Sequence, residues 1–173
     1  GFESVEELRH AVLDIARLDS QRIEFQRKSV ELAQLFSRLG VEYAPMAEAK
    51  GLKLSFAPTS AVVESDPVFL RRIAQNLVSN AIKYTDRGGV LVGVRRRGDR
   101  AWLDILDTGV GIAPEDRSRI FDEFQRIGRE GGAPGMGLGL SIVRRACAKL
   151  GHPISLDSQP GRGTAFRISL PLI

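Results

Sequence analysis

The sequence has few of the residues on which several common scaffolds depend. Cys147 is its single cysteine, so neither an internal disulfide nor a cluster of thiolate zinc ligands can form. No apolar run approaches the roughly 18 residues that a membrane-spanning helix needs, and no signal peptide is recognisable. These absences exclude a disulfide scaffold and argue against a transmembrane segment.

Length, composition and charge indicate one globular domain. The chain has 173 residues, 43% of them apolar, and a net charge of +4 that comes mostly from arginine. The basic run 95–100 could bind nucleic acid, but Gly98-Asp99 separates two strand-like runs and favours a hairpin turn. We therefore expect no nucleic-acid partner. Cys147 lies in a helical run, which predicts a buried, unreactive thiol and fits a reduced, cytoplasmic setting.

The N-terminal third predicts two helices and two strands. Apolar residues at Val5, Leu8, Val12 and Ile15 step by three, four and three, which predicts a helix over 5–22 with a short coiled-coil seam. The alternating run 22–26 predicts a strand. Ser29 is expected to cap the next helix, and a strand is expected over 52–56.

The remainder predicts an α+β two-layer sandwich, in which about three helices cover a mixed sheet. Asp66 is a good helix cap and Pro67 suits the first helical position, so a helix should run from there to about Tyr84. Further elements are expected as follows: strands over 90–96, 101–106, 153–158 and 164–171, a short helix before Phe121, and a helix from Gly137 or Leu138 to Gly151.

The helix that starts at Pro67 carries the first candidate site. Asn76, Asn80 and Lys83 are spaced at i, i+4 and i+7 and share one face. Two amides and an ammonium can hold a hard cation and the phosphates that it bridges, because magnesium prefers oxygen ligands and keeps several waters. A solvated polar face remains the alternative for this helix taken alone.

Two glycine-rich strings follow. Asp107 ends a strand-like run, and its carboxylate can accept a hydrogen bond from a ligand amino group. Gly109 and Gly111 would let the ligand approach the backbone closely. A turn-capping aspartate is the alternative. The string Gly135, Gly137 and Gly139 leads into a helix, where free N–H groups and the helix dipole favour phosphate. It matches neither the Walker loop nor the dinucleotide-binding fingerprint.

In this order and at this spacing, the strings 75–85, 107–112 and 135–141 resemble the ATP-binding boxes of sensor histidine kinases. More distantly, they resemble those of the gyrase, Hsp90 and MutL ATPases. The resemblance implies the Bergerat fold and a catalytic ATP-binding domain over 23–173. Residues 1–22 resemble, more loosely, the end of the dimerisation hairpin of these kinases.

The resemblance also implies roles for single residues. Asn80 would bind Mg²⁺, Lys83 would contact phosphate and Tyr84 would pack beside the adenine. Asn76 stands where ATP-hydrolysing relatives carry a glutamate, and an amide cannot act as a general base. Phosphoryl transfer is therefore favoured over hydrolysis. Arg126 would reach the terminal phosphate, although a solvated arginine is equally consistent.

Further nucleotide contacts are implied by the same resemblance. Asp107 would bind the adenine amino group, and the flexible stretch 127–136 would form the ATP lid, with Met136 where a small hydroxyl residue is common. Phe121 and Phe124 resemble the phenylalanine box. The other implied contacts are Asn76, Gly109, Gly111, Ile112, Gly135, Gly137, Leu138, Gly139, Leu140 and Thr164.

Neither histidine of the sequence matches the phosphoacceptor motif of these kinases. His10 and His152 lack the acidic residue and the Arg/Lys-Thr-Pro that follow the family's acceptor. The chain therefore resembles the catalytic half of a longer receptor, and we expect it to bind ATP without labelling itself. The implied partners are its own hairpin and a response-regulator receiver domain, with this chain monomeric and the full-length protein a homodimer.

We expect the domain to be cytoplasmic, while anchoring of the parent in the bacterial inner membrane stays open. Two other functions stay open as well: a degenerate kinase that binds nucleotide only to switch conformation, and a serine kinase or ATPase of the same fold.

Overall fold

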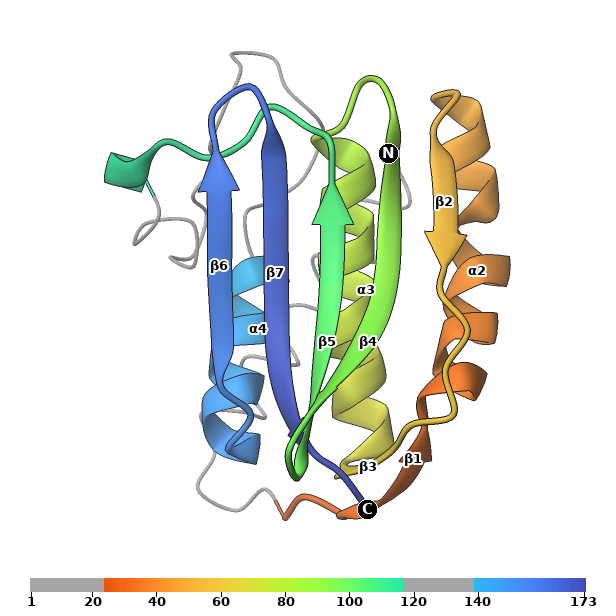
Figure 1. Ribbon diagram of the computed structural model, residues 1–173, viewed down its shortest axis with the longest axis vertical. Coiled ribbons are helices and arrows are strands. Elements are labelled where there is room, and N and C mark those ends of the chain that lie inside the picture. The colour runs from red at the N-terminus through yellow and green to blue at the C-terminus, as the bar shows by residue number, and fades with distance from the viewer. Residues whose placement is uncertain (1–23, 117–138) are drawn as a thin grey trace.

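The computed structural model describes residues 24–116 and 139–173, which form a five-stranded sheet and a small two-stranded sheet. The strand order of the larger sheet is β2-β4-β5-β7-β6 (Figure 1). β2 runs parallel to β4, and every other neighbouring pair is antiparallel. Its strands are β2 (Lys53–Phe56), β4 (Gly89–Arg97), β5 (Arg100–Asp107), β6 (Ile154–Gln159) and β7 (Gly163–Pro171). The mixed sheet is the one expected from the sequence.

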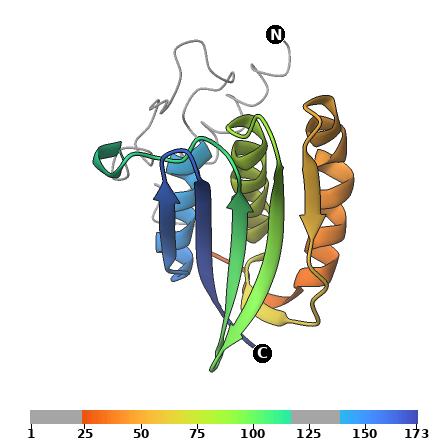
Figure 2. The same cartoon turned by 45° about the horizontal axis from the view of Figure 1, so that its top comes forward.

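Three helices lie against one face of this sheet, and the other face carries no helix among the described residues (Figures 1 and 2). They are α2 (Leu32–Ala49), α3 (Pro67–Lys83) and α4 (Gly139–Leu150). Apolar side chains of these helices and of the covered face, such as Leu77, Ile105 and Ile168, are at most 1% exposed and form the core. The α+β two-layer sandwich is therefore confirmed.

The start of α3 follows from its first residues. The Asp66 carboxylate accepts the backbone N–H groups of Val68 and Phe69 at 2.9 and 3.1 Å. These two donors have no partner within the helix, and Pro67 brings no donor that would need one. The predicted cap and first residue of this helix are confirmed.

The start of α2 corrects the sequence prediction. Ser29 caps no helix: it lies in β1 (Lys28–Glu31), which pairs antiparallel with β3 (Val62–Ser65), a strand that the sequence did not predict. Residues 24–26, the described part of the predicted strand 22–26, form no strand. Glu31 is the residue before α2, and it makes no side-chain cap. Pairing with β3 thus overrides the local preference of serine for a helix cap.

Other predictions have mixed outcomes. The turn at Gly98-Asp99 joins β4 and β5 as a hairpin, as expected. Cys147 is 2% exposed, which confirms the predicted burial, and this burial raises the pKa of its thiol to about 12. The expected helices over 5–22 and before Phe121 lie outside the described residues; a 3₁₀ turn, Pro114–Asp116, is described just ahead of the latter. Within the described ranges, no helix is long and apolar enough to cross a membrane.

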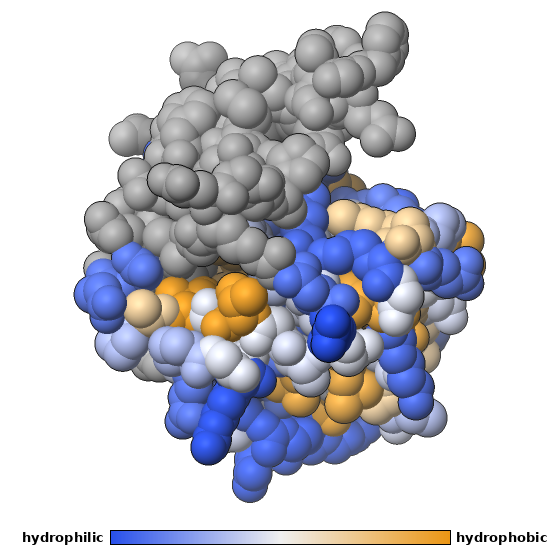
Figure 3. All heavy atoms as spheres, turned by 90° about the horizontal axis from the view of Figure 1, so that it is seen from above, coloured by the Kyte–Doolittle hydropathy of each residue, from blue (hydrophilic) through white to orange (hydrophobic). Residues whose placement is uncertain are grey.

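The elements that carry the predicted site converge at one end of the molecule. The last turn of α3, the end of β5, the β6–β7 turn and the start of α4 all lie towards the upper end in Figure 1. Seen from that end, hydrophobic side chains are visible between hydrophilic ones, next to the segments drawn in grey (Figure 3). This end is therefore the place to look for a ligand.

Candidate functional site

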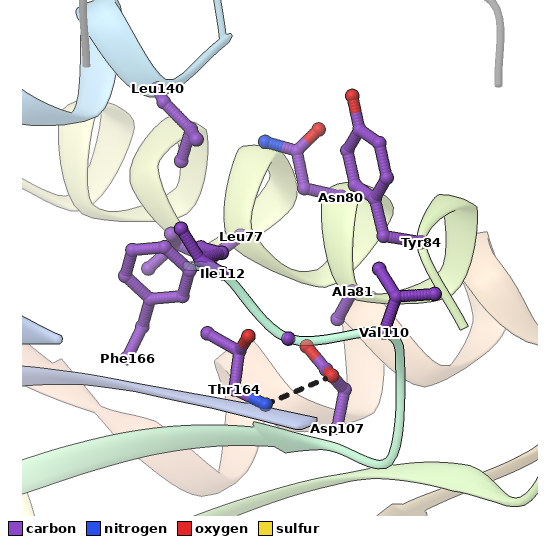
Figure 4. Close-up of a pocket in the computed structure, with 11 residues that line it drawn as sticks. Leu77, Asn80, Ala81, Tyr84, Asp107, Val110, Ile112, Leu140, Thr164 and Phe166 are labelled. Carbon is purple, nitrogen blue, oxygen red and sulfur yellow. Dashed lines mark hydrogen bonds between the residues drawn. The ribbon is translucent and has the colours of Figure 1, made fainter. Parts of the chain in front are cut away.

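A pocket opens where these elements meet (Figure 4). It is an open pocket of about 610 Å³, a volume that includes space continuous with the solvent. Residues from α3, α4, β5, β7 and the loop after β5 line it, and most of them are apolar. They are Leu77, Asn80, Ala81, Tyr84, Asp107, Val110, Gly111, Ile112, Leu140, Thr164 and Phe166.

Asp107 provides the charged group of this pocket. Its Oδ1 atom accepts the backbone N–H groups of Gly109 at 2.9 Å and Thr164 at 3.2 Å. The other oxygen, Oδ2, accepts no hydrogen bond from the described residues. Burial raises the pKa of this carboxyl, and the two backbone N–H groups offset part of the rise. Asp107 thus has one oxygen fixed by the chain and one left for a ligand.

The glycines beside Asp107 are needed for packing of the chain on itself. A Cβ on Gly109 would lie 2.5 Å from the Tyr84 carbonyl oxygen, and one on Gly111 would lie 2.1 Å from the Gln159 carbonyl oxygen. Gly111 also has φ +74°, which a larger residue rarely adopts. The glycines therefore let the loop lie against α3 and the β6–β7 turn. Gly111 also lines the pocket, so the close approach of a ligand expected from the sequence stays a prediction.

Asn76, Asn80 and Lys83 share a helix but differ in position. Asn80 lines the pocket, and it projects from α3 on the side away from Asp107 (Figure 4). Asn76 lies at the contact with α4, where its Nδ2 donates to the Arg72 carbonyl oxygen at 3.0 Å and a Cβ on Gly139 would lie 3.0 Å from its Oδ1. Lys83 is half-buried and is not among the lining residues.

Some of the remaining predicted residues lie in or beside the pocket, and the others lie outside the described residues. Tyr84, Ile112, Leu140 and Thr164 all line the pocket, and Gly139 starts α4 beside it. The expected contacts Gly135, Gly137, Leu138 and Arg126 lie outside the described residues, as do Phe121, Phe124 and Met136. Their roles stay predictions.

Four lining residues were not predicted as site residues. Leu77 and Ala81 of α3 belong both to the core and to the pocket. Phe166 shares the covered face of β7 with Ile168, and Val110 lies between the two glycines. Apolar spacing alone does not distinguish a core residue from one that also walls a pocket.

Comparison with known proteins identifies the family of this chain. Residues 65–173 match the family described as "Histidine kinase-, DNA gyrase B-, and HSP90-like ATPase". The chain belongs to this family. Its relatives are sensor histidine kinases, and the chain is an ATP-binding catalytic domain of that kind.

The relatives extend well beyond this domain. Sensor histidine kinase RcsC of Escherichia coli is 32% identical over 93% of this chain, and the autoinducer 2 sensor kinase/phosphatase LuxQ of Vibrio cholerae is 34% identical over 93%. The chain spans about a fifth of the length of these relatives (18% and 20%). A crystal structure of full-length ShkA in complex with AMPPNP superposes with a TM-score of 0.85 at 32% identity, covering 96% of this chain and 35% of that one.

Proposed function

We propose that this domain binds Mg²⁺-ATP and transfers the γ-phosphoryl group to a histidine on a dimerisation hairpin of the same parent protein. A receiver-domain aspartate of a response regulator would take the group from there. The observation that carries the proposal is Asp107, a half-buried carboxylate with one oxygen fixed by two backbone N–H groups and the other turned to a ligand-sized pocket.

The pocket suits a flat base with an exocyclic amino group. Apolar side chains of Ile112, Leu140 and Phe166 wall it, and Asp107 supplies a charged acceptor among them. A hydrogen bond from a neutral ligand donor to an ionised carboxylate is stronger than one between two neutral groups. Burial strengthens it further, because the surroundings have a low dielectric constant. Adenine has such an amino group, and the relative ShkA was crystallised with the adenine nucleotide AMPPNP.

The phosphate end of the nucleotide would lie towards Asn80. Its amide oxygen is a ligand of the kind that Mg²⁺ accepts, and one protein ligand is enough for an ion that keeps its waters. The described residues hold no cluster of three or more carboxylate, histidine or cysteine side chains that could replace it. When bound, Mg²⁺ would neutralise part of the negative charge of the phosphates. Lys83, Arg126 and the glycine string up to Gly139 would hold the phosphates.

Asn76 favours transfer over hydrolysis, and His152 bears on where the acceptor lies. Asn76 carries an amide, and its N–H already donates to the Arg72 carbonyl oxygen, so it cannot activate water. His152 is only 1% exposed and is hydrogen-bonded to Ser65, so it cannot receive a phosphoryl group as it stands. We therefore place the acceptor histidine on the hairpin, of which residues 1–22 would be the last part.

Titration calorimetry with AMPPNP, with and without Mg²⁺, tests the nucleotide site. We expect micromolar binding that Mg²⁺ strengthens, and no stable label on the chain from γ-labelled ATP alone. A folded chain that does not bind AMPPNP would overturn the proposal. Addition of the parent's hairpin as a separate domain should then yield label on the hairpin histidine, whereas stable label on His10 would contradict transfer to the hairpin.

A further inference from the structure

The open face of the five-stranded sheet carries an aromatic ring surrounded by arginines. Trp102 of β5 is the single tryptophan of the chain, and it is partly exposed. Its neighbour Leu103 is buried in the core, so the alternation of a strand places Trp102 on the face without helices. That face is turned towards the viewer in Figure 1. The guanidinium carbons of Arg95, Arg97 and Arg167 lie 5.8, 5.0 and 4.3 Å from the centre of the ring.

These four residues form the Trp102 cluster, and one of its arginines lacks a carboxylate. Asp104 pairs with Arg95 at 3.0 Å and with Arg167 at 2.7 Å. Arg97 forms no ion pair with any residue that the structure describes. A planar guanidinium can stack on an indole and still present its N–H edge to a carboxylate. The cluster therefore has a position for a carboxylate from another molecule.

Two exposed leucines lie on the same face, nearer the pocket end of the strands. Leu91 and Leu106 are 43% and 37% exposed and stand opposite each other in the register of β4 and β5. Leu106 follows Trp102 by four residues, so it points to the same side at a distance of about 13 Å. Exposed apolar side chains beside Trp and Arg have the composition of a protein interface. The face thus has an apolar end and a basic end.

This pattern favours one class of partner. The backbone groups of a sheet are paired within its plane, so its face offers side chains only and is normally covered by helices, as the opposite face is here. A nucleic acid would bring its phosphates close to Asp104 and would leave the two leucines without a partner. A helix with apolar residues at one end and carboxylates at the other matches both ends of the face.

We propose that the open face is the docking surface for an acidic amphipathic helix of another protein. Its carboxylates would pair with Arg97 and with the exposed edges of the other two arginines, and its apolar side chains would pack on Leu91 and Leu106. The basic and apolar ends are about 13 Å apart, which corresponds to about nine residues of helix. The inference goes beyond the proposed ATP site and does not depend on it.

Trp102 provides the readout, because it is the only tryptophan and lies within the surface. The probe is a synthetic helical peptide of about 20 residues, with leucines and glutamates on one face about nine residues apart. We expect a saturable change in Trp102 fluorescence with a midpoint in the micromolar range, as for a small, transient interface. The same peptide with glutamine for glutamate should bind at least about tenfold more weakly.

Arg97→Gln and Arg96→Gln form a matched pair. They remove the same charge from adjacent positions of β4, but Arg96 donates to Ser60 at 3.3 Å and shares the helix side of the strand with Val94. We expect Arg97→Gln to weaken peptide binding by about fivefold and Leu91→Ala by about threefold, with Arg96→Gln unchanged. The midpoints of the titrations are compared, because the substitutions also alter the fluorescence of the free chain.

Three results would overturn the proposal. They are no binding of the peptide to the folded native chain, equal losses in Arg97→Gln and Arg96→Gln, and a preference for Arg97 over Arg96 that appears only with duplex DNA or phosphatidylglycerol vesicles. AMPPNP affinity should stay unchanged in all three variants, because none of these residues lines the pocket. Failure of the native chain to bind AMPPNP would overturn the proposed function and leave the peptide result standing.

Discussion

Thr164 and Asp107 lie 57 residues apart in the chain and meet through a hydrogen bond of 3.2 Å from the Thr164 backbone N–H to Asp107 Oδ1. The bond joins the end of β5 to the start of β7 and turns one carboxylate oxygen away from the ligand. An aspartate that only capped its own turn would need the Gly109 N–H alone. The second, long-range donor holds the same oxygen from β7, so Oδ2 is the oxygen that stays open to a ligand.

Asp107→Asn should separate binding from stability. The asparagine oxygen can keep both backbone N–H groups, while its NH₂ then replaces the free acceptor with a donor. Loss of a charged hydrogen bond of roughly 1.5–3 kcal/mol predicts AMPPNP binding weaker by about 10- to 100-fold. Calorimetric titration measures this, and unchanged affinity would contradict the assignment.

The stability of the same variant should not fall at neutral pH. The folded state raises the pKa of Asp107, so ionisation of this carboxyl opposes folding above its folded pKa, and the opposition disappears as the pH falls below the unfolded value. Asparagine removes a buried charge. The free energy of unfolding at pH 7 should therefore be equal to or above that of the native chain. Asp157→Asn, an exposed carboxylate on β6, is the control for both measurements.

Gly139→Ala should affect the phosphate end of the site. The added Cβ would lie 3.0 Å from Asn76 Oδ1 and 3.7 Å from Asn80 Nδ2, so at least the Asn76 amide must move. An off-rotamer shift of that kind costs about 0.5–1.5 kcal/mol, which predicts a loss of roughly 2- to 10-fold in Mg²⁺-dependent affinity for AMPPNP. The ratio of affinities with and without Mg²⁺ is the measurement.

Gly40→Ala is the matched control for that change. Gly40 lies inside α2, and a Cβ there would meet Phe56 at an ordinary 3.5 Å. Alanine should stabilise the helix by up to about 1 kcal/mol and leave nucleotide binding unchanged. If both variants weakened Mg²⁺-dependent binding equally, the steric explanation for Gly139 would be wrong.

Local chemistry made α3 predictable and α2 less so. Asp66 and Pro67 favour a helix start whatever surrounds them, and the structure places the start there. Ser29 carries the same kind of capping signal, but its backbone pairs with Glu64 of β3. β3 has only four residues, so periodicity could not reveal the partner that overrides the serine.

Prediction of the site from the sequence was limited in the same way. Asp107, Asn80 and Tyr84 could be named because their strings are continuous in sequence and resemble known boxes. The packing role of Gly111 could not be named, because it depends on how the β6–β7 turn lies against it in the folded chain. Register and packing between distant segments are properties of the folded chain.

The open face of the sheet should contribute to stability and not to nucleotide binding. Asp104 is 6% exposed between Arg95, whose Nη2 lies 3.0 Å from it, and Arg167, whose Nε lies 2.7 Å from it. Both guanidinium groups also lie over the Trp102 ring. Asp104→Asn should cost about 1–2 kcal/mol, because Arg95 is half-exposed and its bond is partly screened.

Denaturant unfolding measures that cost, and Asp157→Asn should stay within about 0.5 kcal/mol of the native chain. AMPPNP affinity should be unchanged in both variants, since neither residue lines the pocket. A change in affinity comparable with that of Asp107→Asn would show that this face and the pocket are coupled.

His152 should make the stability of the domain depend on pH. Burial, and to a smaller extent the charges of Arg27 and Arg100, lower the pKa of its imidazole to about 4. Between pH 6.5 and 4 the unfolded chain therefore binds a proton on His152 that the folded chain does not, so the free energy of unfolding falls as the pH falls through this range. Above pH 6.5 the contribution is complete, and the full loss by pH 4 is about 3 kcal/mol.

Comparison of the native chain with His152→Gln isolates this term, because glutamine can keep a hydrogen bond to Ser65 and does not titrate. The raised pKa of Asp107 acts on stability with the opposite sign, but it is common to both chains. Urea unfolding from pH 7.5 to 4 should therefore give curves that run parallel above pH 6.5 and converge or cross below it. Curves that remain parallel down to pH 4 would show that the folded state protonates His152 as readily as the unfolded one.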